Sequence, residues 1–422
     1  MLTRYRMHKS IGYGTRLLRV TRVGHSRGFG RWWYWDFGWN TMESVDRSKR
    51  ILISVDWFPP AFRAGGPIRS TANLATMLAE HAQVWVVTGG SDLGETNPLV
   101  SQLDQWVSFP TANGPIQVWY GSDINRAFWK KKLREIQPHV VHLNSVFSRA
   151  FTLLPLRLLR TQRQIKTIVA PRGMFGKSAL GIKPLKKRIF LSLTRMMGWM
   201  DSVHWHASSA GEREEVKTIL PRAQVSVAQN LASPLPQDNP ARSSERWRVV
   251  IIGRIHRVKN LDFGLKALLK SSSARPLEVH FIGPVEDATY QDELIALAQE
   301  HPAVSVQFLG GLPPSELKAH FQAAHYLLSS TTQENFGHSI VEAWAHGCPV
   351  LISDRTPWRD LADKGIGWDW PLDPATWATG LETALAANSD QWQAMSEASR
   401  LFFSTHVRSE EAERANLALF EL

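Results

Sequence analysis

The fold is decided by residues 51–90, ILISVDWFPPAFRAGGPIRSTANLATMLAEHAQVWVVTGG. The stretch begins with a short apolar run rich in β-branched residues, which is typical of a buried parallel strand. A loop rich in Pro and Gly follows, and apolar residues then return at helical spacing. A second apolar run over 84–88 ends at Gly89 and Gly90. Strand, helix and strand in this order predict a parallel sheet with a helix packed on its face.

The same alternation continues on both sides of residues 233–246, a segment rich in Pro, Ser, Asn and Asp that predicts a linker. Before the linker we expect further strands at 116–119, 140–143, 167–170, 202–206 and 225–228, and helices at 122–136, 147–163, 183–198 and 209–219. After it we expect strands at 248–252, 278–282, 304–308, 326–328 and 350–353, and helices at 260–270, 289–300, 314–323, 337–346 and 374–387.

The pattern therefore predicts two α/β domains of similar size, and ligands of such sheets bind beyond the carboxyl ends of the strands. The tail reads as one long helix without turn signals, and we expect it to pack back on the first domain. The expected parts are an N-terminal extension at 1–49, a first domain at 50–232, the linker at 233–246, a second domain at 247–390 and the tail at 391–422.

Composition narrows the class of protein. Hydrophobic residues make up 43% and charged residues 21% of the 422 positions, which excludes a disordered or fibrous chain. The single cysteine, Cys348, excludes a disulfide framework and a multi-cysteine zinc site. It fits a reducing compartment, so we expect a cytoplasmic protein. No run of about 18 apolar residues predicts a membrane-spanning helix.

The formal charge of +11 is unevenly placed along the chain. Eight basic residues and one acid leave +7 in residues 1–41, and the remaining residues carry only +4. Basic residues interleaved with tryptophans can bind nucleic acid or a membrane surface. We favour instead a dispensable, disordered or non-native extension, with Met42 as a candidate start, and expect no nucleic-acid partner.

The strongest motif is ENFGHSIVE, residues 334–342. Glu334 lies in a loop and Glu342 on the helix that follows. Gly337 removes a Cβ where backbone could approach a ligand, and a helix start favours an anionic or hydroxyl-rich ligand. A carboxylate can accept hydrogen bonds from two neighbouring sugar hydroxyls. The alternative is a loop charge and a solvated helix face.

Two further loops follow the first strand of each domain. GRIHRVKN, residues 253–260, carries Arg254 and Lys259, two cations that suit a diphosphate. PPAFRAGGP, residues 59–67, places two glycines before a helix, where backbone amides can meet a phosphate. Alone, the first could be an ordinary basic loop and the second a turn.

Together these motifs resemble the retaining glycosyltransferases of family 4, also called glycosyl transferases group 1. The resemblance includes Gly347-Cys348-Pro349-Val350 and runs from about residue 51 to the end of the chain. It implies a GT-B fold, in which two Rossmann-like parallel-sheet domains face each other across a cleft. The segments APRGM at 170–174 and HASS at 206–209, with Glu212, resemble a subgroup that acts in bacterial surface-polysaccharide assembly, such as that of lipopolysaccharide or exopolysaccharide.

The resemblance also implies roles for the motif residues. Arg254 and Lys259 would hold the donor diphosphate and stabilise the departing nucleoside diphosphate. Glu342 would hold the ribose hydroxyls, and Glu334 would contact the donor sugar. The backbone amides near Phe336 and Gly337 would help to hold the sugar. Gly65 and Gly66 would face the diphosphate from the other domain. On the acceptor side it points to Arg172 and His142, but the second histidine that the family often has is Asn144 here. The interdomain turn also departs from the family pattern, because it reads Gln229-Asn230-Leu231.

The activity so implied moves a hexose or N-acetylhexosamine from a nucleotide sugar to a glycan or lipid-linked acceptor, with retention of configuration. The leaving phosphate would take the acceptor's proton. No D-x-D motif occurs, so we expect no metal and no cofactor, with cations doing the electrostatic work. A basic stretch predicts either a solvated helix face or peripheral contact with the inner membrane face; it comprises Lys183, Lys186, Lys187, Arg188 and Arg195.

Three other functions fit parts of the pattern. A GT-B-like sugar-nucleotide epimerase would share the diphosphate site but need no acceptor. A non-catalytic partner subunit would bind the sugar nucleotide without turnover. A nucleic-acid-binding protein is suggested by charge alone.

Overall fold

The computed structural model describes residues 47–422 apart from 177–190, 193, 195–197, 199, 201–202, 239, 241, 244 and 274. Residues 45–422 form one compact unit. Most of the predicted extension and the basic residues of the 183–195 stretch lie outside the described residues.

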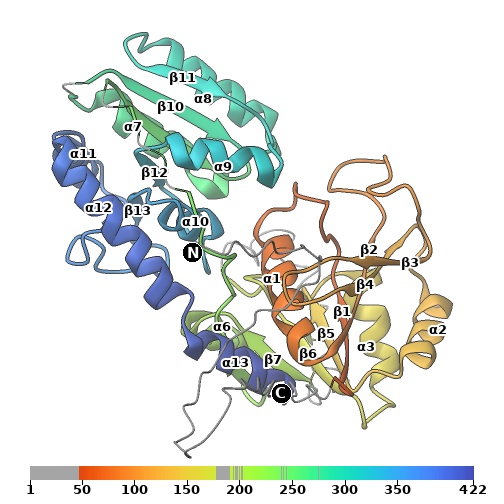
Figure 1. Cartoon of the computed structure of the whole chain (residues 1–422). Coiled ribbons are helices and arrows are strands. Elements are labelled where there is room, and N and C mark those ends of the chain that lie inside the picture. Colours follow the sequence, from red (N-terminus) through yellow and green to blue (C-terminus); the bar gives the residue numbers. More distant parts are fainter. Residues whose placement is uncertain are drawn as a thin grey trace, which may run out of the picture. The chain divides into compact units, whose positions relative to one another are not determined.

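The first domain is built on an eight-stranded sheet with the order β3-β4-β2-β1-β5-β6-β7-β8 (Figure 1). All neighbouring strands are parallel except β3 and β4. The strands are β1 (Arg50–Ser54), β2 (Gln83–Gly89), β3 (Trp106–Phe109), β4 (Ile116–Gly121), β5 (Val140–Asn144), β6 (Lys166–Ala170), β7 (His204–Ala207) and β8 (Gln224–Val227).

The expectation of an all-parallel first sheet is wrong at β3. This strand was not predicted because it has four residues, lies at the sheet edge and shows no buried alternation. It pairs antiparallel with β4 across a short connection, as an edge strand next to a hairpin loop can.

Helices cover both faces of this sheet, as alternating strand residues require. Leu52 points to a core shared with α2 (Arg126–Ile136), α3 (Leu154–Leu159) and α6 (Ala210–Ile219). Ile51 and Ile53 point to the opposite core, against α1 (Gly66–His81). The helix predicted over 147–163 is instead a π-helical turn, η1 (Arg149–Leu153), followed by α3, where Pro155 lacks the amide of a continuous helix.

The second domain has a six-stranded parallel sheet with the order β11-β10-β9-β12-β13-β14. Its strands are β9 (Trp247–Ile252), β10 (Leu277–Ile282), β11 (Ser305–Phe308), β12 (Tyr326–Ser329), β13 (Val350–Ser353) and β14 (Gly367–Trp370). Its helices are α7 (Leu261–Lys270), α8 (Ala288–Gln299), α9 (Pro314–Ala323), α10 (His338–Ala345) and α11 (Pro374–Leu385). The edge strand β14 was not predicted; it is only four residues long and begins at a glycine. Two parallel-sheet domains confirm the predicted α/β architecture.

The tail is not one helix, which corrects the sequence prediction. It consists of α12 (Ser389–Phe402), a π-helical turn η3 (Phe403–Val407) and α13 (Glu410–Phe420). Ser409 interrupts the helix because its side chain caps α13 by accepting a hydrogen bond from the Ala412 amide. Phe403 lies in the core beside α10, whereas Phe420 lies in the core beside α1. The tail therefore connects the two domains.

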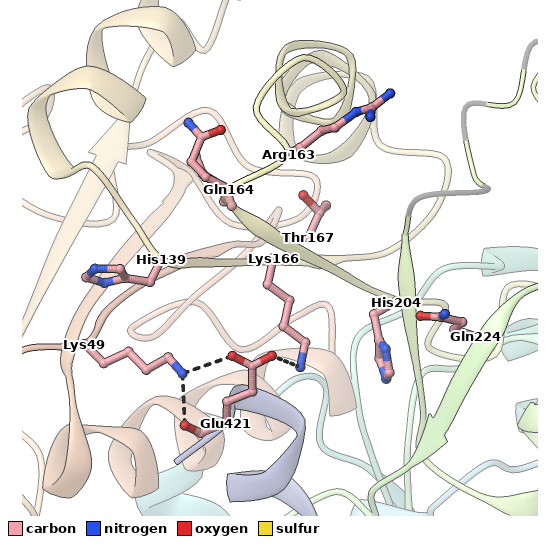
Figure 2. A pocket seen from close by; sticks show the side chains of 10 residues that line it. Lys49, His139, Arg163, Gln164, Lys166, Thr167, His204, Gln224 and Glu421 are labelled. Atoms are coloured by element: carbon pink, nitrogen blue, oxygen red, sulfur yellow. Dashed lines mark hydrogen bonds and ion pairs between the residues drawn. The ribbon is translucent and has the colours of Figure 1, made fainter.

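The Glu421 carboxylate, just after α13, forms ion pairs at the amino-terminal ends of the strands of the first sheet. Glu421 lies 2.9 Å from the Lys166 ammonium and 3.4 Å from that of Lys49 (Figure 2). The three residues line a basic cavity of about 550 Å³ together with His139 and His204. The cavity lies where β5, β6 and β7 begin, and ligands of parallel sheets bind where the strands end.

We predict that Phe420→Ala destabilises the protein by about 3–5 kcal/mol, because it empties a fully buried site in the first-domain core. Urea unfolding monitored by tryptophan fluorescence measures the change. Leu401→Ala on α12 is the control, since that side chain is 64% exposed and should matter little. Equal loss in both variants would contradict the docking of α13.

Candidate active site

Two of the predicted residues follow neighbouring strands of the second sheet. Strand β9 lies between β10 and β12, so the strand order changes direction there. Lys259 ends a 3-10 turn, η2 (Arg257–Lys259), that comes after β9. Glu334 lies in the loop after β12. Crevices at the carboxyl ends of such strands are where open α/β sheets bind ligands.

The structure brings Lys259 and Glu334 together. The Lys259 Nζ donates to Glu334 Oε2 at 2.8 Å, and the side chains are 24% and 23% exposed. Burial acts to raise the pKa of Glu334, but the charge and hydrogen bond of Lys259 and the Asn335 amide outweigh it, so the pKa lies below its ordinary value. The pair therefore presents a fixed carboxylate and ammonium at the edge of the sheet.

Local contacts fix the loop that carries Glu334. The Glu334 amide donates to the Arg355 carbonyl at 2.9 Å, and Trp358 Nε1 donates to the Phe336 carbonyl at 2.5 Å. The Phe336 side chain is buried. Gly337 has φ +75°, and a Cβ there would collide with Ile340. Glycine is required at this helix start for both reasons.

Arg254 is placed differently from the expectation. Its guanidinium bonds both carboxylate oxygens of Glu286, each at 2.7 Å. Both side chains are more than a third exposed. Arg254 thus forms an ion pair with an acid of its own domain, and a diphosphate would have to compete with Glu286 for it.

Glu342 forms an ion pair with a residue that the sequence did not indicate. Its partner is the Arg69 guanidinium on α1 of the first domain. Burial lowers the pKa of Arg69 to about 10, and the Glu342 side chain is 17% exposed. Arg69 resembled any basic residue on a helix surface, so nothing in its spacing marked it.

The glycine loop meets the glutamate motif at His338. A Cβ on Gly66 would lie 3.0 Å from the His338 ring, so the absence of a side chain allows the approach. Ser70 Oγ and His338 Nε2 are 2.6 Å apart. Burial and the charge of Arg69 lower the pKa of His338 to about 3, so its ring is neutral. Gly65, with φ +76°, precedes the helix start.

Beside these contacts is a cavity of about 470 Å³ with a mostly apolar lining. Phe62 and Ile68 line it from the first domain, and Pro313 and Leu317 from the second. Glu342 also lines it. An apolar slot with one carboxylate can hold a flat ring system and the hydroxyls attached to it.

The three predicted acceptor-side residues form one hydrogen-bonded chain. Arg172 Nε donates to Asn144 Oδ1 at 3.1 Å, and the guanidinium also donates to Asn230. Asn144 Nδ2 donates to His142 Nδ1 at 3.1 Å. Asn144 therefore provides both an acceptor for Arg172 and a donor for His142. Burial lowers the pKa of Arg172 to about 10.

The hydrogen bonds also determine which ring nitrogen of each histidine carries a proton. His206 Nε2 lies 2.9 Å from the Ala228 carbonyl, which can only accept, so this nitrogen donates. His206 Nδ1 then accepts from His142 Nε2 at 3.1 Å. Burial lowers the pKa of His206 to about 3 and that of His142 well below its ordinary value. Two neutral imidazoles thus orient the chain that holds Arg172.

Two further carboxylates lie beside the Glu334 loop. Glu212 Oε1 lies 3.4 Å from Asn335 Nδ2, and Glu215 Oε1 lies 3.1 Å from Gln333 Nε2. Glu212 belonged to a quoted motif but had no predicted role. Glu215 was missed because two acids on a helix also suit a solvated face.

Two findings concern only the residues that the structure describes. None of its helices is long and apolar enough to cross a membrane. No group of three or more His, Cys, Asp or Glu side chains is arranged to hold a metal ion there.

Comparison with known proteins identifies one domain. Residues 237–402 match the family model Glycosyl transferases group 1. A curated relative, the D-inositol 3-phosphate glycosyltransferase of Nocardia farcinica, is 35% identical over 112 residues. That match covers 25% of this chain and only 25% of the relative's length.

Solved structures are similar over nearly the whole described chain. Sucrose-phosphate synthase of Thermosynechococcus elongatus has a TM-score of 0.69 at 14% identity, and covers 88% of this chain and 98% of its own. The Anabaena protein HepE, solved with UDP and glucose, has a TM-score of 0.63 at 14% identity with the same coverage. At such identities the similarity shows the fold, and the fold is that of GT-B.

We predict that stability falls as the pH drops from 7.5 to 5. His142 and His206 have lowered pKa values in the folded protein, so only the unfolded chain takes up protons there below about 6.5. At pH 5, each of these two histidines therefore lowers the protein's free energy of unfolding by about 2 kcal/mol relative to pH 7.5. Urea unfolding at the two pH values measures this.

The variant His206→Gln serves as the comparison, since glutamine can keep a donor to Ala228 but does not titrate. Its loss of stability between the two pH values should be smaller by about 2 kcal/mol. An unchanged pH dependence would show that the pair does not stay neutral.

Proposed function

We propose that this chain, which carries a glycosyl transferases group 1 domain in a GT-B fold, is a glycosyltransferase. It transfers a hexose or N-acetylhexosamine from a nucleotide-diphosphate sugar to a glycan or lipid-linked acceptor. The observation that carries the proposal is the ion pair of Lys259 and Glu334 at the carboxyl ends of β9 and β12, together with the cavity that Glu342 lines.

The donor fits this arrangement group by group. The mostly apolar cavity suits a nucleobase, and the Glu342 carboxylate suits ribose hydroxyls. Lys259 supplies a charge for the diphosphate, and Arg254 joins it when a phosphate displaces Glu286. Glu334 then accepts hydrogen bonds from the sugar. A hydroxyl-rich ligand must also compete with Arg69 for Glu342.

The chemistry we propose keeps the anomeric configuration and needs no metal. As the C–O bond to the diphosphate breaks, negative charge develops on the leaving oxygen, and Lys259 with Arg254 stabilises it. The acceptor oxygen attacks from the same face and passes its proton to the departing phosphate.

The acceptor side is proposed at the ends of β5 and β6, where His142 and Asn144 orient Arg172. The APRGM and HASS segments support a role in surface-polysaccharide assembly. We further propose a cytoplasmic enzyme that meets its lipid-linked acceptor at the membrane face.

A thermal-shift panel of nucleoside diphosphates and nucleotide sugars tests the donor class. A donor at 100 times its Kd stabilises the folded protein by about 2.7 kcal/mol, so the matching nucleotide should raise the melting temperature. Incubation with that donor and candidate acceptors then separates transfer from epimerisation, since an epimerase would isomerise the donor alone. No shift with any nucleotide would contradict the proposal.

We predict that Glu334→Gln and Lys259→Ala each lower transfer by about 100-fold or more, the scale of losing one electrostatic contact to a transition state. Rates at saturating donor measure the effect. Lys266→Ala on α7 is the matched control, because that ammonium pairs with Asp262 on the surface and should leave the rate unchanged. Full activity in either variant would contradict the role proposed for the residue replaced.

We also predict that the metal chelator EDTA leaves transfer unchanged within about twofold. Fixed cations then supply the stabilisation that a bound metal would otherwise supply. The rate is measured in chelator-treated enzyme and again after Mg²⁺ or Mn²⁺ is added. Loss of activity that Mg²⁺ restores would overturn metal independence.

A further inference from the structure

The loop that carries Glu334 is flanked by two side-chain amides that reach the other domain. Asn335 Nδ2 lies 3.4 Å from Glu212 Oε1, and Gln333 Nε2 lies 3.1 Å from Glu215 Oε1. Both acids belong to α6 of the first domain. The residues on either side of Glu334 thus each donate a hydrogen bond to a carboxylate of the first domain.

The Glu212 carboxylate is buried and accepts hydrogen bonds from several parts of the structure. The side chain is 2% exposed. Oε2 accepts from the amide and the hydroxyl of Ser208, each at 2.7 Å. Oε1 accepts from the Gly173 amide at 2.5 Å and from Asn335. One carboxylate therefore joins the start of α6, the loop after Arg172 and the loop of Glu334.

Two glycines make this approach possible. A Cβ on Gly173 would lie 2.7 Å from Asn335 Nδ2, closer than real side chains come. A Cβ on Gly176 would collide with the Gln333 amide. The loop after Arg172 therefore has no side chain at the two points where the Asn335 and Gln333 amides lie against it.

We propose that Glu212 is a positioning residue, assisted by Glu215, that holds the Glu334 loop in place from the opposite domain. The same carboxylate fixes the Gly173 amide beside Arg172. It therefore makes the position of the sugar-contacting loop depend on the position of the acceptor-side loop. Glu212 acts through Asn335 and Gly173, and it touches neither donor nor acceptor.

The proposal rests on the proposed function in one respect, because it takes Glu334 as the group that contacts the sugar. Binding of the nucleoside diphosphate is assigned to Lys259, Arg254 and Glu342, which lie outside the 212–335 contact. Loss of that contact should therefore lower kcat and leave the donor KM nearly unchanged. A purely structural role would lower the melting temperature and the active fraction instead.

Asn335→Ala removes the interdomain contact and leaves the Ser208 and Gly173 bonds of Glu212 intact. We expect kcat to fall about 10-fold, the scale of one hydrogen bond to a charged group, with the donor KM within about twofold and the melting temperature unchanged. Glu214→Gln is the matched control on α6, since that side chain is 68% exposed and should change nothing. Full kcat in Asn335→Ala would overturn the proposal.

An exchange of polarity gives the sharper test. Glu212→Gln and Asn335→Asp should each lower kcat, the second because it sets two carboxylates against each other. Together they remove the repulsion between the two carboxylates and let the Gln amide donate to the Asp carboxylate at the cost of the Gly173 bond, so the double variant should recover several-fold over Asn335→Asp. Folded single variants with no recovery in the double variant would contradict a positioning contact.

Hydrogen–deuterium exchange separates this proposal from the proposed function, because it needs no turnover. In Glu212→Gln, peptides over 333–336 and 172–176 should exchange faster while those over 257–260 keep their rates. If wild type transfers no sugar, the function fails but this pattern still tests the contact. Unchanged exchange in both peptides would overturn the inference.

Discussion

The arrangement of the candidate active site depends on the position of one carboxylate, that of Glu334. Glu334 is only 23% exposed, and a carboxylate taken out of water needs a partner. Lys259 supplies it at 2.8 Å from the end of the neighbouring strand, and the Asn335 amide adds a further donor. The pair can form because β9 and β12 are adjacent and parallel, so that their following loops begin at the same edge.

Contacts from the first domain complete the surroundings of this pair. Arg69 and Ser70 on α1 reach Glu342 and His338, while Glu212 reaches Asn335. The second domain alone therefore presents the motif, and the first domain orients it. Under the proposed function, this arrangement would couple donor chemistry to the presence of the first domain, and it would help to exclude water from the sugar.

Much of the architecture could be predicted from the sequence, because buried parallel strands are near-continuous apolar runs. Ile51–Val55 is such a run, and its loop and helix are found as expected. The strands β3 and β14 could not be found, because β3 buries none of its four residues and β14 begins at a glycine and buries only its two end residues. The break at Ser409 was missed because a single capping serine is a weak signal beside a long helical period.

The candidate site was predictable where motif residues lie close in the chain or on adjacent strands, as for Lys259 and Glu334. It was not predictable where a partner comes from the other domain. Arg69 and Glu215 carry no spacing that distinguishes them from surface charges. Within the second domain, Arg254 likewise gave no sign of its bond to Glu286. Tertiary structure alone decides such pairs.

We propose that the nucleotide binds between the glycine loop and the glutamate motif. Hydrogen–deuterium exchange of the whole chain with and without a saturating nucleoside diphosphate tests it most directly. We expect slower exchange in the peptides over 65–69, 257–260 and 334–342, which come from both domains. Protection confined to the basic cavity at Lys49 and Lys166, or no protection in any of the three segments, would contradict it.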